Sequence, residues 1–264
     1  MNIVFFTQDD PFYIKVFFDE FLSKYESLGE IRAIVISNPM GKKSTWRLAR
    51  QMYIFYGLVD FIKVGMRYTF VKIMSRTKPG MRKSGRSPKT YSLKQLAEVF
   101  GIPVIERSNL NRLDFQDMIK TYDPDLFISI ASPIIFKKDL ISIPKIDCIN
   151  IHNSPLPNYR GMLPNFWQLY HGEDSVGITV HKIDKGIDTG DIIRQDRMPI
   201  GHQDTLNDLI IKTKRHNATM IREIIQDYRE GKVIYRKMDG KGSYFSFPTR
   251  KNVIELRKRG RKLI

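Results

Sequence analysis

The sequence has one cysteine, two tryptophans and no long apolar run that is free of charge. The single cysteine, Cys148, excludes an internal disulfide and is typical of the reducing cytoplasm, where we expect the protein to work. The most apolar stretch, residues 52–74, contains four charged residues and so lacks the composition of a membrane-spanning helix. The first residues lack the pattern of a secretory signal, so we expect no export.

Acidic residues are scarce, with 28 Asp and Glu against 44 Lys and Arg. The excess of positive charge is concentrated in two segments. Residues 42–89 contain thirteen basic residues and one acid, Asp60, and residues 250–264 contain seven basic residues and one acid. Because the remainder is almost neutral, the total charge does not by itself indicate a nucleic-acid-binding protein. Hydrophobic residues make up 42% of the chain, in periodic blocks, which excludes disorder as the main state.

The hydrophobic pattern alternates between strands and helices. We expect strands at residues 2–6, 31–37, 103–106, 125–130, 147–153, 176–183, 192–199 and 233–237. We expect helices at residues 12–25, 92–100, 113–122 and 205–229. This alternation predicts an α/β fold with a doubly wound, mostly parallel sheet.

Helix boundaries are predicted from capping residues. Ser92 and Gln95 form a capping-box pattern, and Gly101 follows the same helix as a stop signal. For the last long helix, Asp204 is the predicted cap and Gly231 the predicted stop.

The residues suited to catalysis lie between 150 and 191. Asn150 and His152 are two apart on a predicted strand, so both face one side near its carboxyl end, where open α/β sheets bind ligands. A loop stiffened by Pro155 and Pro157 follows. Further on, Asp188 lies between two glycines in DKGIDTGDII. Each of these features is ordinary when taken alone, whereas their combination is not.

The segments INIHNSPLPNYRG and GITVHKIDKGIDTGDII resemble the formyltransferase family, which includes methionyl-tRNA formyltransferases, glycinamide ribonucleotide transformylases and sugar N-formyltransferases. The family pattern is Asn-x-His-x-Ser-x-Leu-Pro with a later Asp-x-Gly. It matches this chain at Asn150, His152, Ser154, Leu156, Pro157, Asp188 and Gly190. The resemblance is good over residues 123–200 and loose over 1–38 and 91–110. It implies a Rossmann-like catalytic core, which we place at residues 1–249.

The resemblance implies that Asn150, His152 and Asp188 are the catalytic residues. Asn150 and a protonated His152 would donate to the oxyanion that forms when an amine attacks a formyl group, and Asp188 would assist proton transfer. No metal is expected, since the remaining histidines are scattered and form no ligand cluster.

The resemblance also implies 10-formyltetrahydrofolate as the formyl donor, with a pterin pocket formed mainly by backbone. Its two segments correspond here to residues 131–136 and 183–188. The individual candidates are Ser132, Ile134, Phe136, Ile183, Asp184 and Gly186.

The formyl acceptor is expected to be a primary amine, and an amino sugar linked to a nucleotide or lipid is favoured, as in surface polysaccharide synthesis. The first predicted strand lacks the glycine-rich phosphate loop of glycinamide ribonucleotide enzymes, and only a short segment follows Lys237 where methionyl-tRNA formyltransferases have a further domain. The alternatives are a methionyl-tRNA formyltransferase-like enzyme, a formyltetrahydrofolate hydrolase and a non-enzymatic RNA- or membrane-binding protein. Trp167 and Tyr170 follow the motif at helical spacing, which favours core packing over ligand stacking.

Residues 40–90 have no counterpart in the resemblance and are expected to form a basic helical insertion. Within it, residues 46–74 mix aromatic and basic side chains. Three interpretations are open: a helix packed on the sheet or on a second subunit of a homodimer, a helix lying on the inner face of an anionic membrane, or an RNA-binding arm. We expect the core not to depend on this segment, and residues 250–264 to form a frayed basic tail.

Overall fold

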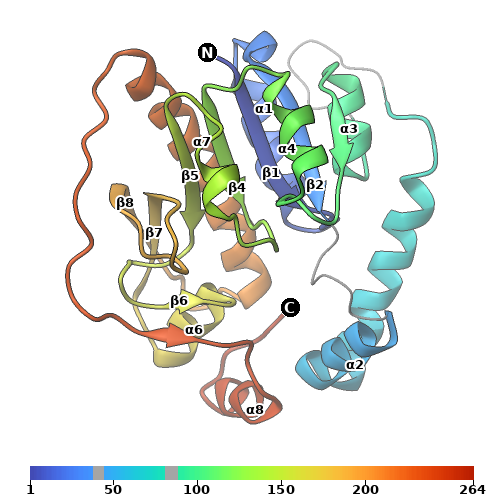
Figure 1. Cartoon of the computed structure of the whole chain (residues 1–264). Coiled ribbons are helices and arrows are strands. Elements are labelled where there is room, and N and C mark those ends of the chain that lie inside the picture. Colours follow the sequence, from blue (N-terminus) through green and yellow to red (C-terminus); the bar gives the residue numbers. More distant parts are fainter. Residues whose placement is uncertain (38–44, 81–88) are drawn as a thin grey trace.

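The computed structural model describes residues 1–37, 45–80 and 89–264 and is organised around a seven-stranded sheet (Figure 1). The strand order is β3-β2-β1-β4-β5-β7-β8. The strands are β1 (Ile3–Gln8), β2 (Ile31–Ser37), β3 (Val104–Glu106), β4 (Leu126–Ile130), β5 (Asp147–His152), β7 (Ser175–Lys182) and β8 (Ile192–Pro199).

The first five strands of the sheet pair in parallel, and β7 and β8 are antiparallel. All five residues of β4 are buried, because the strand is covered on both faces. The predicted doubly wound, mostly parallel α/β architecture is confirmed.

Helices cover both faces of this sheet. The helices are α1 (Ile14–Lys24), α2 (Thr45–Met74), α3 (Leu93–Val99), α4 (Leu113–Lys120), α5 (Lys138–Ile141), α6 (Pro164–His171), α7 (Leu206–Arg229) and α8 (Arg250–Lys258), with a short 3-10 helix at Leu28–Glu30. On one face, Phe5 packs with residues of α1, α3 and α7, and on the other face Phe6 packs with residues of α4 and α5. Alternate residues of β1 therefore anchor two separate hydrophobic clusters.

The helix ends agree with the capping patterns except at α7. Ser92 Oγ accepts a hydrogen bond from the Gln95 amide at 3.2 Å, as predicted. At α7 the predicted cap is wrong by one residue. Thr205 and Asp208 form the capping box, whereas the Asp204 carboxylate accepts from the Gly201 amide and pairs with Lys212. Thr205 is the better placed residue, because its hydroxyl reaches the third amide of the helix.

The predicted C-terminal strand at 233–237 is also wrong. Only one isolated bridge, between Ile192 and Arg236, forms there, since the segment passes the sheet edge without a continuous ladder. The short strand of this region is instead β9 (Tyr244–Phe245), which pairs in parallel with β6 (Arg160–Gly161). This small second sheet joins the end of the chain to the loop that follows β5.

The C-terminal segment is a helix rather than a frayed tail. Thr249 and Asn252 form a capping box at the start of α8, and Val253, Leu256 and Leu263 are buried. These residues belong to a third hydrophobic cluster with α6 and α7. Burial of its apolar residues, and not its basic charge, therefore determines the structure of this segment. The domain boundary after residue 249 stays a prediction, and α8 packs against the body across it.

The main described element of the insertion is α2. Residues 38–44 and 81–88 of the predicted insertion and its border lie outside the described residues. Gly57 interrupts the helix with a non-helical conformation. Phe55 is 4% exposed and its ring lies 5.8 Å from Phe166 and 5.3 Å from Phe247, centroid to centroid. Phe55 thus fills space beside α6, and the expectation that the core folds without this segment stays a prediction.

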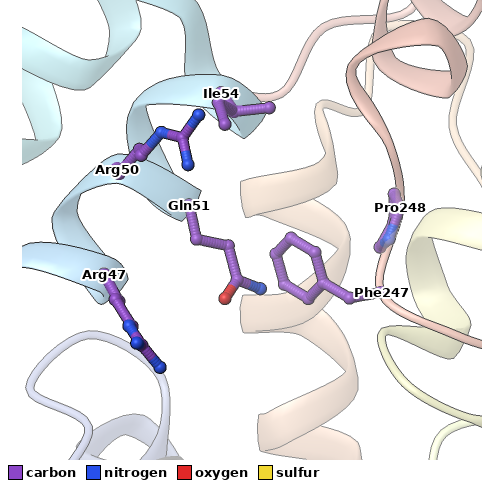
Figure 2. Close-up of a pocket in the computed structure, with 6 residues that line it drawn as sticks. All are labelled: Arg47, Arg50, Gln51, Ile54, Phe247 and Pro248. Atoms are coloured by element: carbon purple, nitrogen blue, oxygen red, sulfur yellow. The ribbon is translucent and has the colours of Figure 1, made fainter. Parts of the chain in front are cut away.

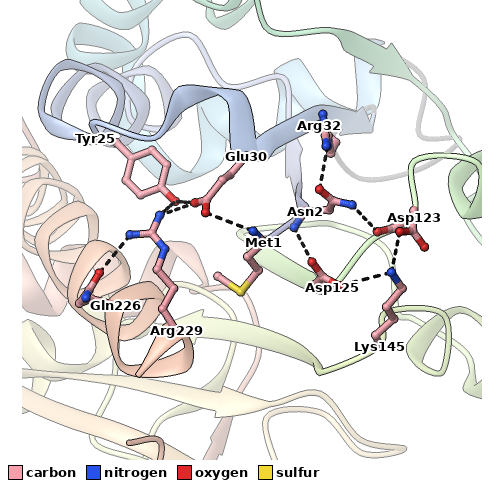
Figure 3. A network of polar contacts seen from close by, with 10 residues as sticks. All are labelled: Met1, Asn2, Tyr25, Glu30, Arg32, Asp123, Asp125, Lys145, Gln226 and Arg229. Atoms are coloured by element: carbon pink, nitrogen blue, oxygen red, sulfur yellow. Dashed lines mark hydrogen bonds and ion pairs between the residues drawn. The ribbon is translucent and has the colours of Figure 1, made fainter. Parts of the chain in front are cut away.

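A polar network holds the amino ends of β1, β2 and β4 (Figure 3). The terminal ammonium of Met1 lies 3.1 Å from Glu30, which also pairs with Arg229 of α7. The Asn2 amide donates to the Asp125 carboxylate at 2.7 Å. Because these contacts lie at the amino edge of the parallel strands, they fix the sheet without occupying its ligand-binding edge.

Replacing Phe55 with Ala is expected to lower the free energy of unfolding by about 3–5 kcal/mol, since a buried ring is lost. The measurement is urea unfolding followed by circular dichroism. The matched control is Phe70→Ala on the same helix, where the ring is 57% exposed and makes one edge contact with Tyr91, so the loss should stay below about 1 kcal/mol. Equal losses in the two variants would contradict a core role for Phe55.

Candidate active site

Two candidate catalytic residues lie at the carboxyl end of β5. Asn150 is half-buried, and His152, the last residue of the strand, is buried. Nε2 of His152 lies 3.0 Å from the Tyr159 carbonyl oxygen. A carbonyl only accepts, so this nitrogen carries the proton and Nδ1 faces the other way.

The neighbouring strand adds a second histidine. Asn150 is opposite His181 in the antiparallel pairing of β5 and β7, and Nδ2 of Asn150 lies 3.2 Å from Nε2 of His181. Nδ1 of His181 donates to the Lys182 carbonyl at 2.7 Å. The neutral ring therefore presents its unprotonated Nε2 to the Asn150 amide and fixes the orientation of that amide.

Asp188 lies between the two histidines. Its Oδ1 is 3.7 Å from Nδ1 of His152 and 3.7 Å from Nε2 of His181. Its Oδ2 accepts a hydrogen bond from the Gly161 amide at 3.0 Å. These contacts bring the three sequence-predicted residues Asn150, His152 and Asp188 together, with His181 as a fourth member.

The loop that carries Asp188 requires unusual backbone. Asp188 has φ of 54°, a left-handed conformation that Asp tolerates better than most residues. At Gly190, an added Cβ would lie 2.0 Å from the Lys182 carbonyl oxygen, so only glycine lets the loop return to β7 this closely. The Asp-x-Gly spacing therefore has a steric reason in this structure.

A pocket of about 150 Å³ opens beside these residues. It is lined by Ser129, residues 132–136, Asn150, His181, Ile183, Asp184 and residues 186–188. All six predicted donor-binding residues are among the lining residues (Ser132, Ile134, Phe136, Ile183, Asp184 and Gly186). His152 is not among them and approaches Asp188 from another side. The structure thus brings the two predicted backbone segments onto one pocket, next to the candidate catalytic residues.

The sequence analysis missed His181, which it grouped with scattered histidines. The available signal was its position: it precedes the Asp188 loop on a predicted strand, although only strand pairing reveals its register with Asn150. Trp167 is 7% exposed, and its indole N–H donates to the Ser246 carbonyl, so the predicted core packing is confirmed. Within the described residues, no group of three or more His, Cys, Asp or Glu side chains is placed to hold a metal ion.

Burial lowers the pKa of His181 below its ordinary value of 6.5, against the opposing effect of Asp188. As the pH falls, the His181 ring therefore becomes protonated at a higher pH in the unfolded chain than in the folded chain. The stability that the neutral ring contributes is present above pH 6.5 and is lost as the pH falls through the lowered pKa.

We therefore expect the ring resonances of His181 in an NMR titration to shift only below pH 6.5. The resonances are assigned by comparison with His181→Gln, which lacks them. A midpoint at or above 6.5 would contradict a neutral ring that accepts from Asn150.

Residues 1–225 match the formyl transferase family. A methionyl-tRNA formyltransferase of Ehrlichia ruminantium is 32% identical over 182 residues, which cover 66% of this chain and 59% of that protein. The chain thus spans less than two thirds of the length of this curated relative.

Two solved structures show the same fold. An N-formyltransferase from Helicobacter canadensis, solved with folinic acid and dTDP-3-aminofucose, has a TM-score of 0.56 at 21% identity, covering 93% of this chain and 71% of that one. A glycinamide ribonucleotide transformylase from Symbiobacterium toebii has a TM-score of 0.57 at 17% identity, covering 90% and 95%. With the family match over most of its length, the chain belongs to the formyl transferase family.

Proposed function

We propose that this protein transfers a formyl group from 10-formyltetrahydrofolate to the primary amine of an amino sugar. The observation that carries the proposal is that Asn150, His181 and Asp188 line the same pocket as the six predicted donor-binding residues. A donor held there would place its reactive group beside an amide donor and a carboxylate, which are the groups that acyl transfer to an amine requires.

The pocket suits the pterin end of a folate. Ile134, Phe136 and Ile183 offer apolar surface, which suits a flat ring. At Gly186 an added Cβ would lie 2.0 Å from Oγ1 of Thr189, so this tightly packed loop has no room for a side chain there. Gly186 therefore lines the pocket with backbone atoms alone. The pocket volume is below the roughly 300 Å³ at which pockets for drug-sized ligands begin. We therefore place only the ring system inside it, and the remainder of the donor along the protein surface.

Asn150 is proposed to stabilise the developing negative charge. When bound, 10-formyltetrahydrofolate supplies the formyl carbon that the amine attacks. One N–H of the Asn150 amide is engaged by His181, and the second is available to the formyl oxygen. Because His181 orients the amide beforehand, this donor needs no rearrangement during the reaction.

Asp188 and His152 are proposed to take the proton that leaves the amine and to pass it to the folate nitrogen, whose bond to the formyl carbon breaks as the new amide bond forms. Oδ1 of Asp188 faces Nδ1 of His152 across 3.7 Å, which is longer than a direct hydrogen bond. A substrate amine seated beside this pair of atoms would lie within hydrogen-bonding distance of both. The Tyr159 carbonyl holds His152 so that Nδ1 stays directed to this space.

The amino-sugar acceptor is supported by the Helicobacter canadensis structure, which was solved with an amino sugar linked to dTDP and aligns over 93% of this chain. Methionyl-tRNA is the second candidate, because the Ehrlichia ruminantium relative carries that name at 32% identity. Hydrolysis of the formyl donor is a further outcome, since water could take the place of the amine. We expect this chemistry to take place in the cytoplasm, as the single reduced and buried Cys148 suggests.

The variants Asn150→Ala, His152→Ala and Asp188→Ala should each lower kcat by on the order of a hundredfold or more. Folate binding, measured by calorimetry, should fall much less for His152→Ala, because His152 does not line the pocket. His202→Ala, an exposed histidine, is the matched control and should keep normal turnover. Near-normal turnover of the His152 variant would contradict the proposed mechanism.

The acceptor is tested by incubating the protein with 10-formyltetrahydrofolate and, in separate reactions, dTDP-3-aminofucose, other dTDP- and UDP-linked amino sugars, or methionyl-tRNA. Mass spectrometry of the products should show an N-formylated sugar. Formyl-methionyl-tRNA as the only product would favour the second candidate. Formate released at the same rate with and without acceptor would indicate hydrolysis.

A further inference from the structure

Helix α2 exposes most of its large apolar side chains. In its second half, after the break at Gly57, six such residues are between 50% and 64% exposed, among them Val59 and Met66 at the upper end. We call these six the apolar stripe: Leu58, Val59, Ile62, Met66, Phe70 and Ile73. In Figure 1, α2 lies at the edge of the molecule, away from the sheet.

The stripe runs along one side of the helix and is interrupted by the polar Thr69. Apart from the adjacent Leu58 and Val59, its members recur at intervals of three and four residues, which places them on one face about a third of the helix circumference wide. Half-buried residues such as Phe61, Val64 and Met74 are on other sides. A surface helix of a globular protein normally has its apolar face inward, so a helix with an outward apolar stripe needs an apolar partner.

Basic residues border the stripe on both sides. Lys63 and Arg67 lie on one border and Lys72 on the other, and all three are exposed. The acid of this helix, Asp60, is paired with Arg257 of α8 at 2.8 Å. The surface around the stripe is therefore positive.

We propose that α2 docks on an anionic lipid bilayer, with the apolar stripe inserted at the level of the headgroups. Apolar side chains flanked by Lys and Arg are the composition of helices that lie in a membrane interface. Trp46, 78% exposed in the first turn of α2, is the residue type favoured at that depth. Within the described residues no helix is long and apolar enough to cross a bilayer, so this contact would be peripheral.

The basic and apolar side chains of α2 together favour an anionic membrane over a second copy of the chain or an RNA strand. A second copy of the chain would bring the two basic borders together, and like charges repel. An RNA strand would engage the basic residues but would leave the aliphatic Leu58, Val59 and Ile62 without apolar contact, since bases stack on flat aromatic side chains. Only an anionic membrane satisfies both the positive border and the aliphatic stripe.

A pocket beside the first half of α2 has the same chemical character (Figure 2). It measures about 180 Å³ and combines the guanidinium groups of Arg47 and Arg50 with the apolar surfaces of Ile54, Phe247 and Pro248. Arginine donors suit phosphate oxygens, and Ile54, Phe247 and Pro248 offer apolar surface beside them. The first half of α2 thus also combines basic and apolar groups.

The test is flotation of the full chain with vesicles of equal parts phosphatidylcholine and phosphatidylglycerol, and with vesicles of phosphatidylcholine alone. The protein should float with the anionic vesicles at low salt and largely dissociate at high salt. Trp46 fluorescence should shift to the blue on binding, and Trp46→Phe should abolish that shift.

Two sets of variants separate the apolar from the electrostatic contribution. Leu58→Ser, Ile62→Ser and Met66→Ser combined should weaken vesicle binding by at least roughly tenfold with the charge unchanged. Lys63→Gln and Lys72→Gln should each weaken it about fivefold. The matched control replaces the exposed Leu113, Ile146 and Ile234 with Ser, and should bind as the unchanged protein does.

Three results would overturn the proposal. The first is equal flotation with neutral and anionic vesicles. The second is retention of tRNA with no flotation, which would identify an RNA-binding arm. The third is a dimer in sedimentation that the triple serine variant converts to a monomer, while neither protein binds vesicles, which would assign the stripe to a subunit contact.

Discussion

The site depends on the close return of the loop after β7 to the carboxyl end of β5. Gly190 allows that loop to touch the Lys182 carbonyl, and the left-handed Asp188 can then reach both His152 and His181. A side chain at position 190 would push the loop away and separate the carboxylate from the imidazoles. One steric constraint therefore holds together three groups for which we propose roles in one reaction, and such groups must lie within a few ångströms of one another.

The ends of the chain support this arrangement from two directions. At the amino edge of the sheet, Glu30 and Asp125 hold the start of β1. Beside the candidate site, β9 pairs with β6 in the small second sheet. Gly161 of β6 donates its amide hydrogen to Asp188. The C-terminal segment thus contributes to the backbone around the site, which gives it a positioning role in addition to its packing through α8.

Helix α2 has two distinct roles on two of its sides. Phe55 joins it to the core beside α6, whereas the apolar stripe faces outward between basic residues. The inward contact makes the helix part of the folded body, and the outward face is unsatisfied within a single chain. The proposed contact with an anionic membrane would hold the catalytic domain at the surface where lipid-linked sugars are found, although neither proposal requires the other.

Hydrophobic periodicity and short-range spacing are local properties, so the alternation of strands and helices, the mostly parallel sheet and the motif residues could be predicted from the sequence. It placed Asn150 and His152 on one strand face, and the six residues it named for donor binding are all among those that line the pocket. Three features could not be predicted, since each depends on contacts between residues distant in the chain: the position of His181 beside Asn150 and Asp188, the pairing of β6 with β9, and the burial of α8. The sequence of α2 likewise predicted a basic aromatic helix, but which side faced outward was decided by what the rest of the fold could cover.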